Sequence, residues 1–268
     1  MTLSIDLDPI AFTLGGFAVR WYGLTALAAI ALAVVLVRRG AVRAGVPTAV
    51  VDDGAIWVGV AALVGGRALY IVQNELPDLA IHPLHALAIW HGGLSFYGGL
   101  VAGLIVLWLF ARRRGLAFGR AADLVAPAAA AGQAVGHIGC LIGGDSYGLP
   151  SDGPLAIVYR NAGAMAPQGI PLHPTQLYEA LALAGLAAVL WVGRGRLGAI
   201  GPGAIAATYL LANAAIRFGL FFLRDDLVVA GGLKVTQLIA IAIAVGALTW
   251  LVALRRPGRL PRLAEVRT

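Results

Sequence analysis

Long apolar stretches follow one another along this chain, with only short polar segments between them. A stretch of about 20 apolar residues is long enough to cross the hydrocarbon core of a bilayer as a helix. Such stretches occupy residues 17–37, 52–74, 94–111, 121–142, 174–193, 200–223 and 235–254. The pattern predicts an all-α integral membrane protein with seven transmembrane helices, organised as a single polytopic membrane domain over residues 1–268.

The composition agrees with a membrane protein. Hydrophobic residues make up 60% of the chain and charged residues only 12%, whereas soluble domains are about 25% charged. The first span follows a segment that contains Asp6 and Asp8 and lacks basic residues. Because a cleavable signal peptide begins with a basic region, we expect this first span to remain as a helix.

The basic residues gather in the connections on one side of the predicted spans. Of the 20 lysines and arginines, 14 lie there, and by the positive-inside rule this side faces the cytoplasm. The 14 residues are Arg38, Arg39, Arg43, Arg112, Arg113, Arg114, Arg120, Arg194, Arg196, Arg255, Arg256, Arg259, Arg262 and Arg267. This distribution predicts an outer N-terminus, a basic cytoplasmic tail at about 255–268 and an extracytoplasmic connection at about 143–173. Topology thus explains the basic clusters, and we expect no nucleic-acid partner.

Three arginines lie inside or at the edge of apolar spans, namely Arg20, Arg67 and Arg217. A lone arginine at the bilayer centre costs at least ~2.5 kcal/mol, so each must face a polar cavity, pair with an acid or extend to the interface. Extension to the interface suits Arg20 better than Arg67 or Arg217 because Arg20 lies near a span end. Since acids are scarce in the spans, a cavity lined by arginines predicts an anionic ligand such as a phospholipid headgroup.

Glycines are concentrated at the outer end of the fourth span. Residues 136–148 contain five glycines and finish with polar residues, a composition that favours unwinding. Irregular backbone at membrane depth requires surrounding protein or a water-filled cavity, so we expect a broken helix beside a site. The alternative is a glycine-rich helix end that enters a loop. For the spaced pairs Gly99/Gly103, Gly132/Gly136 and Gly139/Gly143, close helix packing is the favoured interpretation for most members.

The start of the fifth span carries three polar side chains inward. Pro174 suits the first turn of a helix, and Gln176, Tyr178 and Glu179 follow it. A single polar residue in a span is compatible with a satisfied core group, whereas three favour a functional lining.

The remaining candidate groups predict little chemistry. Cys140 is the single cysteine, which excludes an internal disulfide, and burial in a helix seam is its favoured role. His82 and His85 have a spacing seen in metal sites, but a third ligand is missing from the pattern. We therefore expect neither a metal nor a cofactor.

In their order along the chain, these motifs resemble the prolipoprotein diacylglyceryl transferase family, from Asp8 through the seventh span. The matching segments are Asp8-Pro9-Ile10, Val19-Arg20-Trp21-Tyr22-Gly23, Gly65-Gly66-Arg67, Gly92-Gly93-Leu94-Ser95-Phe96 with Gly98-Gly99, residues 136–148, His173-Pro174-Thr175-Gln176-Leu177-Tyr178-Glu179, and residues 217–224 with Gln237. The resemblance implies a transferase that moves a diacylglyceryl group from phosphatidylglycerol to the sulfur of the lipobox cysteine of a prolipoprotein. Glycerol phosphate is released in this first step of lipoprotein maturation.

The resemblance also implies a cellular location and a set of site residues. The protein would lie in the bacterial cytoplasmic (inner) membrane, with phosphatidylglycerol, a lipobox peptide and membrane lipid as partners. The reaction needs a proton acceptor for the thiol and cations around the phosphate. The implied catalytic residues are His137, Tyr97 and Arg217. The implied substrate-binding residues are Tyr22, Arg67, Gly98, Gly136, Gly148, Gln176, Tyr178, Glu179 and Arg224.

The chain departs from the family pattern at four important positions. Tyr97 and His137 stand where the family commonly has histidine and arginine. Cys140 and Phe221 stand where asparagine and glutamate are usual. One interpretation is an active, divergent transferase in which His137 binds the phosphate as imidazolium or accepts the thiol proton, and Tyr97 hydrogen-bonds the headgroup. The other is a paralogue or transporter that binds anionic phospholipid without transferring it.

Overall fold

The computed structural model describes residues 3–87 and 93–255. The described residues contain seven helices that are long and apolar enough to cross a membrane. These helices are α1 (Trp21–Arg43), α2 (Thr48–Asn74), α4 (Phe96–Arg113), α5 (Phe118–Gly143), α6 (Thr175–Gly198), α7 (Ala204–Leu220), which a 3-10 turn η3 (Phe221–Leu223) extends, and α8 (Val235–Leu254). The prediction of an all-α, multi-pass membrane protein is confirmed. The expected basic tail from Arg256 onward and the motif residue Gly92 lie outside the described residues.

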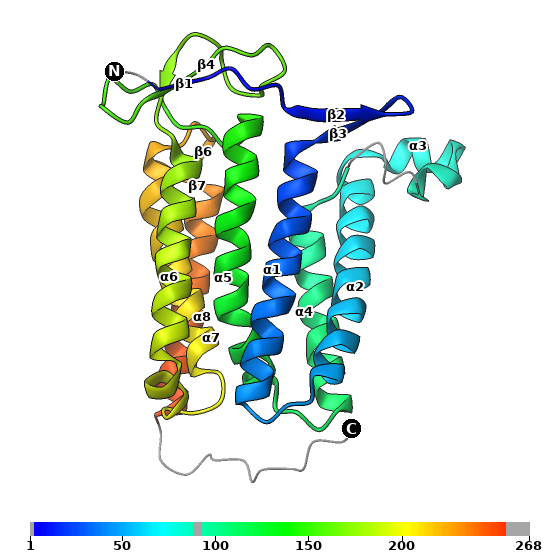
Figure 1. The fold of residues 1–268 in the computed structure, drawn as a ribbon, viewed down its shortest axis with the longest axis vertical. Coiled ribbons are helices and arrows are strands. Elements are labelled where there is room, and N and C mark those ends of the chain that lie inside the picture. The colour runs from blue at the N-terminus through cyan, green and yellow to red at the C-terminus, as the bar shows by residue number, and fades with distance from the viewer. Residues whose placement is uncertain (1–2, 88–92, 256–268) are drawn as a thin grey trace. The chain divides into compact units, whose positions relative to one another are not determined.

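Short strands and turns connect the helices (Figure 1). They are β1 (Leu3–Ile5), β2 (Ile10–Leu14), β3 (Phe17–Arg20), β4 (Ile157–Tyr159), β5 (Pro171–Leu172), β6 (Val228–Ala230) and β7 (Leu233–Lys234), with α3 (Leu76–Ile81) and a 3-10 turn η1 (Pro83–Leu87). Strand β4 lies between β1, to which it is parallel, and β5, to which it is antiparallel. The other two pairs, β2–β3 and β6–β7, are antiparallel.

The first transmembrane helix begins later than the sequence predicts. Residues 17–20, expected inside the span, form β3 of a hairpin instead. The hairpin turn uses Gly15 and Gly16, both with positive φ, a conformation that glycine adopts without steric cost. Arg20 is therefore the exposed last residue of a strand, and it needs no partner within the helix.

The described residues form two compact units. The first comprises residues 3–36 and 122–255, and the second comprises residues 37–87 and 93–121. The single-domain organisation expected from the sequence stays a prediction.

The first unit has its core where α5, α6 and α7 meet. Alanines of α5 pack against leucines of α6 and Ile205 of α7. The core residues are Ala126, Ala130, Ala134, Leu183, Leu186, Leu190, Ile205 and Ala206. At one end of this core, the Asp123 carboxylate accepts hydrogen bonds from the backbone N–H groups of Gly203 and Ala206 at the start of α7. Asp123 thus satisfies backbone donors that a helix start leaves unpaired.

Helix α5 continues without a break to Gly143, so the broken helix expected within residues 136–148 is wrong. The chain leaves the helix only at Gly144, which has a φ of 75°. A glycine inside a helix costs about 1 kcal/mol, whereas each unpaired backbone group in a membrane costs several kcal/mol. The helix is therefore the cheaper conformation, and the glycine-rich helix end that enters a loop is what the structure has.

The spaced glycines serve close packing at most, but not all, of the expected positions. In the second unit, an added Cβ at Gly99 would lie 2.9 Å from the carbonyl oxygen of Ala62. In the first unit, Gly132 and Gly139 lie against α1 in the same way. Gly136 and Gly143 have no heavy atom of their described unit within 4 Å of such a Cβ. The packing interpretation is therefore wrong for those two glycines.

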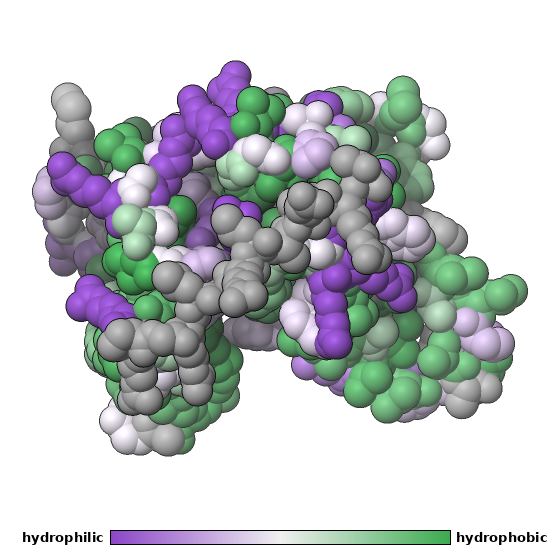
Figure 2. Space-filling view, turned by 90° about the horizontal axis from the view of Figure 1, so that it is seen from below, coloured by the Kyte–Doolittle hydropathy of each residue, from purple (hydrophilic) through white to green (hydrophobic). Residues whose placement is uncertain are grey.

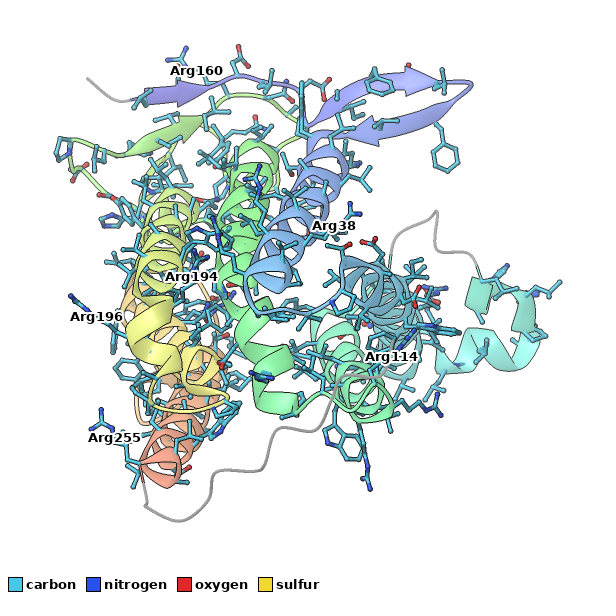
Figure 3. The ribbon with its side chains drawn as sticks, turned by 60° about the horizontal axis from the view of Figure 1, so that its bottom comes forward. Arg38, Arg114, Arg160, Arg194, Arg196 and Arg255 are labelled. Carbon is cyan, nitrogen blue, oxygen red and sulfur yellow. The ribbon has the colours of Figure 1, made fainter. Side chains whose placement is uncertain are left out.

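Basic side chains mark one end of the helices in the first unit. Arg194 and Arg196 lie toward the far end of α6, and Arg255 follows α8, whereas Arg160 lies beside the strands that connect the other ends (Figure 3). The face that is seen from below in Figure 2 carries several hydrophilic side chains. Arg194, Arg196 and Arg255 thus lie at the helix ends that adjoin the short connections or the C-terminal tail.

Candidate active site

The predicted site residues divide between the two units. Tyr97, Arg67 and Gly98 belong to the second unit. The others belong to the first unit and come from α1, α5, α6 and the end of α7, together with the connection between α5 and α6. They are Tyr22, Gly136, His137, Gly148, Gln176, Tyr178, Glu179, Arg217 and Arg224.

A buried histidine and a buried glutamate meet between α5 and α6. Nδ1 of His137 lies 3.1 Å from Oε2 of Glu179, and the two side chains are 12% and 1% exposed. No hydrogen bond from the described residues reaches either carboxylate oxygen of Glu179. A buried carboxylate without hydrogen bonds is costly. This pair therefore has the capacity to accept a proton or a hydrogen bond from a bound molecule.

A second acidic group, Asp145, lies just beyond the end of α5. The Cys140 thiol is within hydrogen-bonding reach of the Asp145 carboxylate, and both groups interact electrostatically with Tyr22 of α1. Tyr22 is half exposed, and Oδ1 of Asp145 is buried without a hydrogen-bond partner among the described residues. Asp145 also interacts electrostatically with His137. The carboxylate of Asp145 thus belongs to the same polar cluster, although the resemblance did not single it out.

The first turn of α6 fixes the chain that follows α5. The Thr175 hydroxyl donates to the carbonyl oxygen of Ser146 at 2.7 Å, and Nε2 of Gln176 donates to that of Asp145 at 2.6 Å. Nε2 of Gln176 also lies 3.4 Å from the hydroxyl of Tyr159, which donates to the carbonyl oxygen of Leu141. Burial raises the pKa of Tyr159, so this phenol remains a neutral donor. The Gln176 side chain thus positions Asp145 by donating to the backbone carbonyl oxygen of Asp145.

Two arginines at the end of α7 supply positive charge near this cluster. Arg217 and Arg224 both interact electrostatically with His137. Among the described residues, no hydrogen-bond acceptor or acid forms a hydrogen bond or ion pair with the Arg217 guanidinium. Nε of Arg224 lies 3.1 Å from the partly exposed Asp226 carboxylate. A cation without a counter-anion in a membrane protein indicates a site for an anion.

A buried lysine, Lys234, fixes the turn that carries Arg224. Nζ of Lys234 donates to the carbonyl oxygens of Phe221, at 2.6 Å, and Arg224. Gln237 donates to the carbonyl oxygen of Phe218 and accepts from the backbone N–H of Lys234. The spacing from Lys234 to Gln237 is the signal of a helix start, but it does not reveal the burial of the lysine.

The two glycines predicted to bind substrate have opposite surroundings. Gly136 adjoins open space next to His137. Gly148 lies where two chain segments meet, because its N–H donates to the carbonyl oxygen of His173 and an added Cβ would lie 2.8 Å from that of Leu223. Tyr178 is partly buried, and its ring lies 6.3 Å from that of His173. A side chain would thus have room at Gly136, whereas Gly148 serves backbone packing.

In the second unit, the guanidinium of Arg67 is occupied by the protein. Nη2 lies 2.8 Å from Oε2 of Glu75 and donates to the carbonyl oxygen of His85 at 2.6 Å. Nε donates to the carbonyl oxygen of Ala86 and Nη1 to that of Gly93. Arg67 therefore pairs with an acid, one of the three outcomes expected from its sequence, and it holds both sides of the connection between α2 and α4.

The other two site residues of this unit lie in the first turn of α4. Tyr97 is 43% exposed, and its ring contacts Phe96 edge to face at 5.5 Å. Gly98 is buried against α2, where a Cβ would overlap the backbone of Gly65. The Tyr97 side chain is thus partly exposed. The close packing of α4 against α2 explains the glycine at position 98.

Comparisons with known proteins agree with the resemblance seen in the sequence. The family model described as prolipoprotein diacylglyceryl transferase matches residues 9–253. The phosphatidylglycerol–prolipoprotein diacylglyceryl transferase of Solidesulfovibrio magneticus is 34% identical, with 96% of this chain and 98% of the relative covered. The protein of the same name from Gloeobacter violaceus is 37% identical over 91% and 92% of the two chains. That from Chromohalobacter salexigens is 39% identical over 82% and 80%.

Proposed function

This chain belongs to the prolipoprotein diacylglyceryl transferase family, and from that premise we propose that the polar cluster of α5, α6 and α7 is where it transfers a diacylglyceryl group from phosphatidylglycerol to a prolipoprotein. The carrying observation is the buried His137–Glu179 pair close to two arginines. The names of the relatives support transfer and give no support to the non-transferring alternative.

The His137–Glu179 pair accepts the proton of the acceptor thiol. The sulfur atom then attacks the carbon of the diacylglyceryl group that is bonded to a phosphate oxygen. A carbon–sulfur bond forms, and the bond between that carbon and the phosphate oxygen breaks. Thiolate is the reactive form of a cysteine, and histidine is the side chain best suited to take a proton near neutral pH. Glu179 favours the protonated imidazole because a carboxylate at 3.1 Å stabilises its positive charge.

Arg217 and Arg224 bind the phosphate of phosphatidylglycerol and stabilise the charge that develops on the leaving oxygen. Glycerol phosphate leaves with the electron pair of the broken bond. Guanidinium groups suit this task because they are permanently charged and present several donors to phosphate oxygens. The backbone at Gly136 leaves room for the substrate beside His137, and Tyr22 of α1 contributes its hydroxyl group.

The acceptor is the lipobox cysteine of the prolipoprotein, which reaches the site from the outer face of the bacterial cytoplasmic membrane. The basic connections support a cytoplasmic location for the ends of α1, α4 and α6 that carry them. The strands near Arg160 are then outside (Figure 3), with the N-terminus. The site, at the strand-bearing ends of α5 and α6, is thereby on the side where secreted prolipoproteins emerge.

Mass spectrometry of a lipobox peptide incubated with the purified full-length protein and phosphatidylglycerol tests this function. The wild type should add a diacylglyceryl mass to the peptide cysteine. His137→Ala should lower the rate by about 100-fold or more, since a general base contributes 10²- to 10⁴-fold. Arg217→Ala should lower it by a similar factor because it removes phosphate stabilisation.

Two controls make the outcome specific. A peptide with serine in place of the cysteine should gain no mass, and Arg196→Ala, at the opposite end of α6, should keep the wild-type rate. Absence of any mass increase with wild-type protein that still binds phosphatidylglycerol would favour a lipid-binding paralogue. A fully active His137→Ala variant would remove His137 from the proton-transfer step.

A further inference from the structure

The ring of Phe221 is contacted by both arginines of the proposed phosphate site. The guanidinium carbon of Arg224 lies 4.5 Å from the ring centroid, and that of Arg217 lies 6.0 Å from it. The Phe221 side chain is only 3% exposed. A guanidinium is attracted to the face of an aromatic ring, and the attraction is strongest where water is excluded. One neutral side chain thus attracts two cations without cancelling the charge of either.

Hydrogen bonds from the start of α8 fix the backbone around this ring. Nζ of the buried Lys234 donates to the carbonyl oxygens of Phe221 and Arg224, and Gln237 donates to that of Phe218. These carbonyl groups lie at or beyond the end of α7 and η3, where hydrogen-bond partners within a helix become scarce. The positive charge of Lys234 is therefore directed to backbone oxygens, and the turn between the two arginines has a defined conformation.

The charges near the ring leave room for one more anion. Asp226 pairs with Arg224 at a partly exposed position, and within the described residues no acid pairs with Arg217. In place of the glutamate that is usual in the family at position 221, the aromatic ring holds the two arginines without adding a charge.

From this arrangement we infer that Phe221 is a positioning residue that holds Arg217 and Arg224 as a preformed pair of cations for the phosphate of phosphatidylglycerol. Lys234 keeps Phe221 in place through its carbonyl oxygen. The inference rests on the proposed function, because it assigns these arginines to the phosphate of the lipid substrate. It concerns affinity for the headgroup, and it leaves proton transfer to the His137–Glu179 pair.

Steady-state kinetics with phosphatidylglycerol micelles and a lipobox peptide test the inference. Phe221→Met removes the ring at similar volume, and its KM for phosphatidylglycerol should rise about tenfold, with a smaller change in kcat, because one to two desolvated cation–π contacts are lost. Phe221→Tyr should restore the KM to within about twofold, since the ring remains.

A neighbouring aromatic residue provides the matched control. Phe222 is exposed and contacts the ring of Phe218, and its ring has no guanidinium contact within the described residues. Phe222→Met should keep the wild-type KM. Lys234→Met should raise the KM in the same direction as Phe221→Met, because it releases the turn that carries the ring.

Inhibition by glycerol phosphate distinguishes a loss of affinity for the headgroup from a general disturbance of helix packing. Its inhibition constant should rise in Phe221→Met in step with the KM and stay unchanged in Phe222→Met. Equal KM values for Phe221→Met, Phe221→Tyr and the wild type would overturn the inference. Failure of the wild type to modify the peptide would instead overturn the proposed function itself, so the two failures are distinguishable.

Discussion

Single residues in this protein differ most in whether their polar atoms already have partners. The buried Glu179 carboxylate has a histidine at 3.1 Å and no hydrogen bond from the described residues. The buried guanidinium of Arg67, in contrast, donates to Glu75 and to three carbonyl oxygens. Unsatisfied buried groups are available to substrates, whereas satisfied ones hold the fold together. The two classes of residue therefore call for different experiments.

Replacement of Arg67 should affect stability more than lipid affinity. Arg67→Met leaves Glu75 and three carbonyl oxygens without their donor, and breaking such a pair costs about 3 kcal/mol. We expect a lower midpoint of thermal unfolding in detergent, with a KM for phosphatidylglycerol close to that of the wild type. Glu75→Gln, which keeps a hydrogen-bond acceptor, should be milder. A raised KM at an unchanged unfolding midpoint would instead identify Arg67 as a phosphate ligand.

At the scale of elements, close helix pairs depend on glycine at particular positions. Helices α2 and α4 approach so closely that an added Cβ at Gly98 would overlap the backbone of Gly65. Without a hydrophobic driving force between helices in lipid, such close contact is a major source of association energy. The same requirement explains Gly139 in the first unit, which lies against Thr25 of α1.

A matched pair of glycine substitutions on this helix pair tests the packing role. Gly98→Ala should destabilise the protein by about 1–3 kcal/mol, as overpacking does. Gly59→Ala, on α2 where no atom of the described unit lies near the added Cβ, should be neutral or stabilise by up to about 1 kcal/mol through helix propensity. Thermal unfolding of the two purified variants gives both values. Equal midpoints would argue against close packing at Gly98.

At the scale of the whole molecule, the distribution of charge predicts how the chain lies in the membrane. The connections after α1, α4 and α6 are short and follow helix ends that carry arginines, whereas the α5–α6 connection is long and contains β4 and β5. Long connections are tolerated on the outer side, and arginine-rich short ones remain in the cytoplasm. The proposed site and its prolipoprotein substrate then share the outer side.

Cysteine labelling in whole cells tests this orientation. In a Cys140→Ala background, Ala162→Cys should react with a membrane-impermeant maleimide in intact cells, because the connection that contains it faces outward. Ala117→Cys, between α4 and α5, should react only after the membrane is opened. Both positions are exposed within their own units, so burial does not account for a difference. The reverse labelling pattern would invert the topology.

The sequence by itself determined the membrane class, the seven spans and the family. Hydrophobicity adds up along each segment, and a transmembrane helix satisfies its backbone groups internally, so these properties need no knowledge of distant contacts. The resemblance also pointed to His137, Glu179 and Arg217 as site residues. Local composition misled where it was read as local geometry, as in the unbroken α5 and in the strand that precedes α1.

The tertiary structure decided which polar groups meet. His137 and Glu179 lie on different helices, Arg67 donates to carbonyl oxygens beyond its own helix, and Lys234 reaches back to the end of α7. Whether a charged side chain binds protein or substrate depends on distances of a few ångströms between segments that are remote in sequence. Packing fixes those distances, and hydrophobic periodicity does not report them.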